Sequence, residues 1–287
     1  MKITPVVSVA LTLILPGIAL AQSSTDPNIV HLATVTTVQT GGLLDDLIAD
    51  FTQRTGYRVD VYAGEDLYSQ ARAGNADVVF SHFGHKDAEP FLSDGLGQWP
   101  HVVLANTIAF LVPPNDPARV RAAKDPVEAF QRIAQTKSPF IVNNIDGLQY
   151  LVNTLWNASG RPDKTGWYSD AGLQMEDAIR EASGKAGYTL WGVSPFLEYQ
   201  QPFNSGTTPA NLQPVIFNDS LMQRIMVSIV VNPGKFPQAN MKGALAFQDY
   251  LLNPETQARI RAFRFPGIDQ PLFWPEGRSN SSIFLPR

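Results

Sequence analysis

The sequence contains no cysteine among its 287 residues. This absence excludes disulfide bonds, thiolate metal ligands and cysteine nucleophiles. An excess of positive charge is missing as well, because 22 Lys and Arg residues face 26 Asp and Glu residues. The resulting net charge of −4 argues against nucleic acid as a partner, since binding its phosphates calls for a basic face.

Long apolar runs are scarce, and the one that is present lies at the N-terminus. A basic start leads into the apolar run Val6–Leu20, which is followed by Ala21. This pattern predicts a secretory signal peptide over residues 1–21, cut before Gln22. No later run approaches the roughly 20 apolar residues that a bilayer span requires. We therefore expect an exported, periplasmic protein.

Catalytic signatures are also missing. No P-loop or dinucleotide fingerprint occurs, and Gly192-Val193-Ser194-Pro195 lacks the closing glycine of a nucleophile elbow. His82 and His85 have Asp87 and Glu89 nearby, but this spacing in a predicted loop favours solvated or hydrogen-bonded histidines over a metal site. We expect no enzyme, no cofactor and no metal.

The chain has one stretch, Ile29 to Phe51, around which the rest is organised. The strand Ile29–Ala33 leads through a hydroxyl-rich loop and Gly41-Gly42 into the helix Leu43–Phe51. The hydroxyls of this loop belong to Thr34, Thr36, Thr37 and Thr40. Unpaired N–H groups and a positive dipole at a helix start can hold an anion or a polar group. An equally good interpretation is that Thr40 merely caps the helix.

The following segments continue this plan. Strands are predicted over Tyr57–Tyr62 and Ala76–Ser81, with the helix Leu67–Ala73 between them. Two successive β-α-β units imply a parallel sheet with ligand sites at the carboxyl ends of its strands. The long apolar strand Val102–Val112 is suited to crossing between two lobes.

The second half of the chain repeats the strand, polar loop and helix. A strand Pro139–Val142 is followed by the polar turn Asn143–Gly147 and the helix Leu148–Ser159. An exposed loop is predicted from Gln200 to Gln213, and a tail without regular structure from Gly267. Further helices are predicted over Asp125–Thr136, Met175–Ser183, Pro195–Tyr199, Met241–Leu252 and Thr256–Phe263, and further strands over Tyr188–Trp191, Val215–Phe217 and Met226–Val231.

The order of these motifs resembles the type II periplasmic solute-binding proteins, and most closely the tungstate-binding receptors of bacterial ABC importers. The matching segments span nearly the whole chain in the family's order. They are Leu32–Thr37 with Gly42-Leu43-Leu44, Gly74–Val78 with His82, Ala123–Phe130, Gly187–Leu190, Val231-Asn232-Pro233 and Asp269–Phe273.

The resemblance implies an α/β protein with two lobes that close on a ligand. Residues 22–108 with 236–287 would form the first lobe, and residues 109–235 the second. The implied function is that of a monomeric receptor, which binds an oxyanion such as tungstate or molybdate in the cleft and delivers it to a membrane permease.

The ligand loops depart from the family pattern. Val35 interrupts the hydroxyl run, and Ala63-Gly64-Glu65 replaces a Gly-Thr-Gly loop. The turn Asn143–Gly147 lacks an Arg, and Trp191-Gly192-Val193 stands where the family carries Asp-Arg. A carboxylate about 4 Å from an anion repels it by roughly 4 kcal/mol at an effective dielectric constant of 20. Glu65, if it faces the cleft, therefore opposes oxyanion binding; alternatively it points to solvent at a helix start.

The resemblance assigns ligand-binding roles to six residues. Thr36 and Thr37 would donate hydrogen bonds from the first lobe, and Gly64 would let the backbone approach beside Glu65. Asn143 and Asp146 would close the site from the second lobe.

Two alternatives keep the fold. In one, Glu65, Asp66 and Asp146 hold a neutral or cationic solute; in the other, the protein presents a solute to a sensor. Aromatic side chains could stack on an organic ligand, although burial in the lobe core is the favoured interpretation. They are Trp167, Tyr168, Tyr188 and Trp191.

Overall fold

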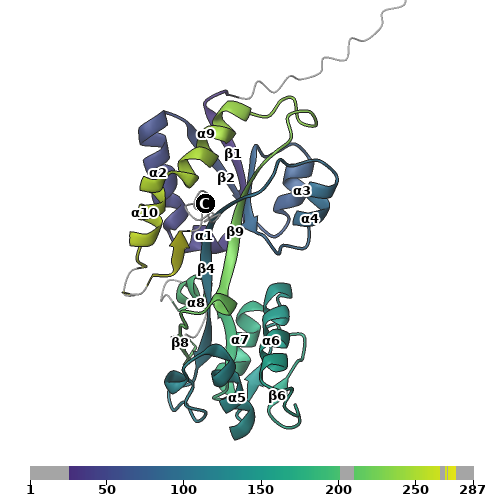
Figure 1. Cartoon of the computed structure of the whole chain (residues 1–287), viewed down its shortest axis with the longest axis vertical. Coiled ribbons are helices and arrows are strands. Elements are labelled where there is room, and N and C mark those ends of the chain that lie inside the picture. Colours follow the sequence, from purple (N-terminus) through teal and green to yellow (C-terminus); the bar gives the residue numbers. More distant parts are fainter. Residues whose placement is uncertain (1–25, 201–209, 266–268, 270, 276–287) are drawn as a thin grey trace, which may run out of the picture.

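The computed structural model describes residues 26–200, 210–265, 269 and 271–275. The predicted signal peptide, residues 1–21, lies outside the described residues, as do most of the predicted 200–213 loop and most of the tail. Figure 1 shows an upper and a lower body joined by long strands. None of the helices in the described part of the chain combines the length and the apolar character that a membrane span requires.

The upper body is built on the two predicted β-α-β units. Strand β1 (Ile29–Thr34) lies between β2 (Arg58–Ala63) and β3 (Val78–His82) and runs parallel to both. The connecting helices are α1 (Thr36–Thr40), α2 (Leu43–Thr55) and α3 (Leu67–Arg72). The predicted parallel pairing is confirmed, and it brings the carboxyl ends of three strands to one edge of the sheet.

The turn before α2 differs from the sequence-based interpretation. Gly42, with φ of 73°, occupies the cap position of α2, and no side chain caps this helix. A left-handed φ suits glycine because a side chain there would clash with the backbone. The cap position is thus Gly42 rather than Thr40, and the hydroxyl-rich loop winds into the short helix α1.

Two antiparallel strands cross between the bodies (Figure 1). The first part of β4 (His101–Val112) pairs with β9 (Gln223–Val230), which in turn pairs with β3. The last residues of β4 pair instead with β7 (Thr189–Gly192) and β8 (Gln213–Val215). The predicted long strand is therefore confirmed, and β4 belongs to the sheets of both bodies.

The lower body contains α5 (Pro126–Thr136) and the predicted strand, loop and helix repeat. Asp125 caps α5, because the Glu128 N–H donates to its Oδ1 (2.7 Å), and Pro126 occupies the first turn. The aromatic core includes Trp167 and Tyr188, both buried as predicted. The other elements are β5 (Phe140–Ile141), α6 (Asp146–Ala158), β6 (Tyr168–Ser169), α7 (Met175–Gly184) and α8 (Val193–Tyr199), with a 3₁₀ turn at Val120–Ala122.

The C-terminal elements return to the upper body. Helix α9 (Met241–Leu252) packs on β1 and β9, and α10 (Pro254–Ala262) follows at once. Strand β10 (Phe273–Pro275) pairs antiparallel with β4. The prediction that the tail lacks regular structure is therefore wrong there, because pairing with a distant strand and burial of Phe273 are not local sequence signals. Helix α4 (Ala88–Ser93) and a 3₁₀ turn at Ser220–Met222 were not predicted either.

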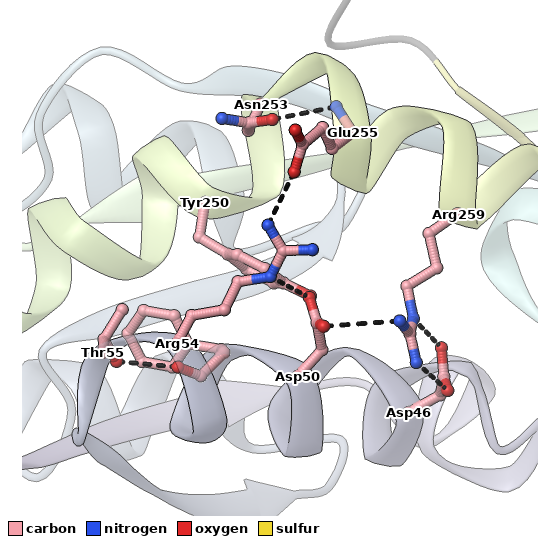
Figure 2. Close-up of polar contacts among 9 residues, drawn as sticks. Asp46, Asp50, Arg54, Thr55, Tyr250, Asn253, Glu255 and Arg259 are labelled. Carbon is pink, nitrogen blue, oxygen red and sulfur yellow. Dashed lines mark hydrogen bonds and ion pairs between the residues drawn. The ribbon is translucent and has the colours of Figure 1, made fainter.

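An ion-pair network fastens α10 to α2 (Figure 2). Arg259 of α10 forms two hydrogen bonds to Asp46 of α2, at 2.5 and 2.7 Å. Asp50 accepts a hydrogen bond from the Tyr250 hydroxyl (2.8 Å), and Arg54 bridges Asp50 and Glu255. The network thus joins two helices of the upper body that are far apart in the sequence, α2 and α10.

The division of the chain at residues 108/109 and 235/236 stays a prediction. Strand β9 falls in the predicted second lobe, yet its residues 226–230 pair with β3 of the upper sheet. This pairing favours a second crossing point nearer to residue 223 than to residue 236.

Candidate functional site

A cavity of about 690 Å³ lies between the two bodies. Its upper wall comes from segments that follow the parallel strands. Thr36 and Thr37 follow β1, Glu65 follows β2, and His82 ends β3. The carboxyl ends of parallel strands are the usual place for ligands in open α/β sheets. The candidate site thus lies where the sequence predicted a ligand.

The crossing strands supply the floor of the cavity. Asn106 of β4 lies directly opposite Arg224 of β9 in the antiparallel register. His82 lies opposite Met226, two residues from Arg224, and side chains two apart on a strand share a face. Three polar side chains from three neighbouring strands therefore project from one face of the sheet, and all three line the cavity: His82, Asn106 and Arg224.

The lower wall is formed mainly by the starts of two helices. Ile145, Gly147 and Leu148 come from the start of α6, and Gln174, Met175 and Glu176 from the start of α7. No side chain caps α6, whereas the first amide of α7, that of Met175, donates to the Asn143 side chain (2.9 Å). The amide groups and the positive dipole end of the 13-residue α6 therefore face the cleft. Further lining residues from the same body are Trp191, Gly192, Pro195, Glu198 and Tyr199.

Arg224 reaches across the cleft to the start of α6. A β-carbon built on Gly147 would lie 2.5–2.6 Å from Nη1, Nη2 and Cζ of the Arg224 guanidinium. The planar guanidinium therefore packs directly over the glycine backbone. A side chain at Gly147 would have to displace it.

The Arg224 cation is half-buried and has no ion-pair partner among the described residues. Burial lowers the pKa of Arg224, and the Glu65 carboxylate partly offsets this effect. An arginine remains charged in a protein even so. A desolvated cation without a counter-ion, beside amide donors, favours an anion as its partner.

The charges around the cavity are mixed. Lys86 and Arg224 contribute cations, whereas Glu65, Glu176 and Glu198 contribute carboxylates. The sequence-based interpretation covered only the ligand loops of the family pattern. It therefore missed both cations, because neither Lys86 nor Arg224 lies in one of those loops.

His82 is held in its neutral form. Burial, followed by the nearby Arg224 cation, lowers the pKa of His82 to about 3. Its Nε2 lies 3.4 Å from the Asn106 Nδ2. Burial also lowers the pKa of His85, although Asp87 and Glu65 oppose the shift. Within the described ranges, no group of three or more His, Asp or Glu residues is placed to hold a metal.

Of the six predicted site residues, three line the cavity and one lies beside it, all four in the upper body. Thr36, Thr37 and Glu65 line the cavity, and Glu65 is exposed there. The Gly64 N–H donates to the Thr34 carbonyl (3.0 Å), so this glycine lies beside the lining segment. The ligand-binding roles of all these residues stay predictions.

The two remaining predicted residues belong to the lower body. Asn143 is 1% exposed, and its Oδ1 accepts a hydrogen bond from the Met175 N–H (2.9 Å). It therefore holds the start of α7 from behind the wall. Asp146 is the first residue of α6, next to Gly147. The roles assigned to both residues also stay predictions.

Sequence reasoning missed Arg224 and Asn106 as candidate ligand residues. Asn106 lies inside the apolar run of β4, and Arg224 precedes the predicted start of its strand at Met226. The signal that was present is a polar side chain inside the apolar run of β4 and a charged one beside the apolar run of β9. Buried polar residues of this kind usually have a partner or a function.

A two-bodied α/β fold with a polar cleft between the bodies is that of a solute-binding protein, and the comparisons with known proteins agree. The chain belongs to the PBP superfamily: the sequence profile of a PBP superfamily domain matches residues 21–255. Its fold is of the periplasmic-binding-protein type, as predicted.

Three relatives are similar over most of the chain. The tungstate-binding protein TupA of Peptoclostridium acidaminophilum is 29% identical over 252 residues, which is 86% of this chain and 85% of the relative. The solved tungstate binding protein TupA of Desulfovibrio alaskensis G20 is 26% identical with a TM-score of 0.71, covering 86% of this chain and 98% of that one. The tungstate ABC transporter structure of Geobacter sulfurreducens is 28% identical with a TM-score of 0.63, covering 79% and 95%. The predicted resemblance to tungstate-binding proteins is confirmed.

Proposed function

We propose that this protein is the extracytoplasmic receptor of an ABC-type importer and that it binds a tetrahedral oxyanion of the tungstate and molybdate class. The observation that carries the proposal is Arg224, a half-buried cation packed over Gly147 at the uncapped start of α6. The relatives named above, described as tungstate-binding, support the same ligand class.

The energetics favour an anion at this place. A guanidinium can bind two oxygens of an oxyanion at once, which gives a charge-assisted contact of fixed geometry. The start of α6 adds about 0.3–1 kcal/mol for a negative charge near it. A cation offsets a carboxylate at equal distance, so Arg224 compensates for Glu65 in the upper wall. Thr36 and Thr37 supply hydroxyl groups from the opposite side.

Binding requires the bodies to approach each other. The cavity, of about 690 Å³, is far larger than a single five-atom oxyanion. A five-atom oxyanion inside it would touch one wall at a time. We propose that the bodies close about β4 and β9, with residues 22–108 and 236–287 on one side and 109–235 on the other. The pairing of β9 with β3 moves the second hinge toward residue 223.

The same proposal gives the location of the protein and its partner. Export by the signal peptide, residues 1–21, would place the protein outside the cytoplasm, and a membrane permease would take the ligand from the monomeric receptor. The cleft would bind its ligand without changing it, since the relatives are described as binding proteins.

A second ligand class has its own supporting observation. Three carboxylates line the cavity, Glu65, Glu176 and Glu198, against the two cations Lys86 and Arg224. This surplus of negative charge favours a neutral or cationic solute in the same cleft, either for transport or for presentation to a sensor.

Calorimetry on residues 22–287 tests the ligand class. Titration with tungstate, molybdate, sulfate and phosphate should give saturable binding, strongest with tungstate or molybdate. A thermal-shift screen with neutral and cationic organic solutes runs beside it. Silence with all four anions, together with a stabilising amine or neutral solute, would replace the oxyanion proposal with the second class.

A further inference from the structure

The side-chain oxygen of a buried amide on the floor of the cavity lacks a hydrogen-bond partner within the described part of the chain. Asn106 is 4% exposed and lines the cavity, yet its Oδ1 has no partner among the described residues. The Asn106 Nδ2 has a hydrogen-bond partner, the His82 Nε2 at 3.4 Å. An unsatisfied buried polar atom costs about 1–3 kcal/mol, and such groups persist where they serve a function. The unpaired oxygen is an acceptor, so a contact to an anion has to come from the Nδ2 donor of the same amide.

The position of Asn106 is tied to Arg224. The two residues form a directly opposed pair on antiparallel strands, and side chains in such pairs lie within about 5 Å at their β-carbons. Both side chains leave the same face of the sheet and line the same cavity, so one ligand on the floor of the cavity can contact both. Nothing similar holds for Asn143, which lies behind the wall.

His82 determines which group the amide offers. His82 is neutral, so its Nε2 either accepts a hydrogen from Asn106 Nδ2 or, in the other tautomer, donates to Oδ1. When Nε2 accepts, one amide N–H points at the imidazole and the second N–H of Nδ2 remains for a ligand. A neutral imidazole thus orients the amide without adding a competing charge.

We propose that Asn106 is a specificity-determining residue of the cleft, which donates an amide N–H to the bound oxyanion, and that His82 is the positioning residue that orients this amide. The inference rests on the proposed function and deepens it. Arg224 and Asn106 together form the sheet-side half of the anion site.

Matched substitutions test the proposal by calorimetry with tungstate and molybdate. Asn106→Asp keeps the shape but replaces the N–H donor with an acceptor that is negatively charged, so affinity should fall at least a hundredfold. Asn106→Leu removes the donor without adding charge, and affinity should fall about tenfold, which is the scale of one hydrogen bond. His82→Leu should weaken binding several-fold, and His82→Gln, which keeps an acceptor, should restore part of the loss.

A second measurement uses the wild-type chain, in case a substitution at a buried site prevents folding. The sequence has four histidines, so the imidazole nitrogen resonances of His82 can be assigned by comparison with His82→Gln. In the free protein they should report a neutral ring with a bare Nε2. Addition of tungstate should shift the Asn106 side-chain amide resonances.

The outcomes separate this inference from the function on which it rests. Wild-type protein that binds none of the anions overturns both. Wild-type protein that binds tungstate, while Asn106→Asp binds equally well or the Asn106 amide resonances do not move, overturns the role of Asn106 alone. Equal affinities for His82→Leu and wild type overturn the positioning role of His82.

Discussion

The Arg224 guanidinium packs over Gly147, so a residue of the crossing strand β9 contacts the start of α6 in the lower body. This contact brings the cation of β9 to the positive end of α6. An anion held by both would lie at the floor of the cleft, and the upper body would reach it through Thr36 and Thr37 on closure.

Gly147→Ala should separate stability from binding. Alanine favours a helix over glycine, which stabilises the fold by about 0.5 kcal/mol, but its β-carbon displaces the Arg224 guanidinium. We expect an unchanged or slightly raised melting temperature and about tenfold weaker tungstate binding. Gly184→Ala is the control, because nothing lies within 4 Å of a β-carbon there. Full affinity in the Gly147→Ala variant would show that the Arg224 position is immaterial.

Glu65→Gln should strengthen oxyanion binding. The substitution keeps the side-chain size and removes one negative charge from the upper wall of the cavity. At about 8 Å and an effective dielectric constant of 20, that charge repels an anion by roughly 2 kcal/mol per unit charge before salt screening. We expect about tenfold tighter binding at low salt and a smaller gain at high salt. Glu89→Gln on α4, exposed and outside the cavity lining, should change nothing. Weaker binding by Glu65→Gln would favour the cationic ligand class.

Arg259→Gln should lower stability without affecting binding. Arg259 joins α10 to Asp46 and Asp50 of α2, and these carboxylates raise its pKa. The side chains of Arg259 and Asp46 are 41% and 35% exposed, so the contribution of this pair is about 1 kcal/mol or less. In a chain of this size that amounts to about 2–4 °C in melting temperature at low salt. Arg180→Gln, which removes an exposed pair within α7, is the control. A loss that is equal at low and high salt would point to packing rather than charge.

His82 should make the fold sensitive to moderate acid. Its pKa lies at about 3 in the folded protein, below the ordinary value of 6.5, so the unfolded chain binds more protons between these values. The free energy of unfolding therefore falls as pH drops from about 6.5 toward 3, by up to about 1.4 kcal/mol per pH unit. Denaturant unfolding at pH 7, 5.5 and 4.5 should show a steeper loss for wild type than for His82→Gln. Parallel curves would contradict a His82 that is held neutral in the fold.

Local chemistry explains which elements were predictable. Asp125 with Pro126 and Asn253 with Pro254 mark the starts of α5 and α10, since caps and first-turn prolines act within a few residues. The strand β1 and helix α2 followed from short apolar patterns. β10 could not be predicted, because its residues become a strand through pairing with β4, which is distant in the sequence.

The site was predictable on one side only. Thr36, Thr37 and Glu65 follow parallel strands, so their place at the cleft followed from the β-α-β pattern. Asn106 and Arg224 meet through the register of β4 with β9, which a single sequence does not reveal. The sequence therefore showed that the ligand loops lack the cations of the family pattern. It did not show that Arg224 of β9 brings a cation to the same cleft.

Calorimetric titration of tungstate into wild type and Arg224→Gln tests the central claim most directly. Arg224→Lys, which keeps the charge but not the two-pronged geometry, and Arg180→Gln serve as comparisons. The account predicts saturable binding by wild type, at least hundredfold weaker binding by Arg224→Gln, an intermediate value for Arg224→Lys and no change for Arg180→Gln. Tungstate binding by Arg224→Gln as tight as that of wild type would contradict it.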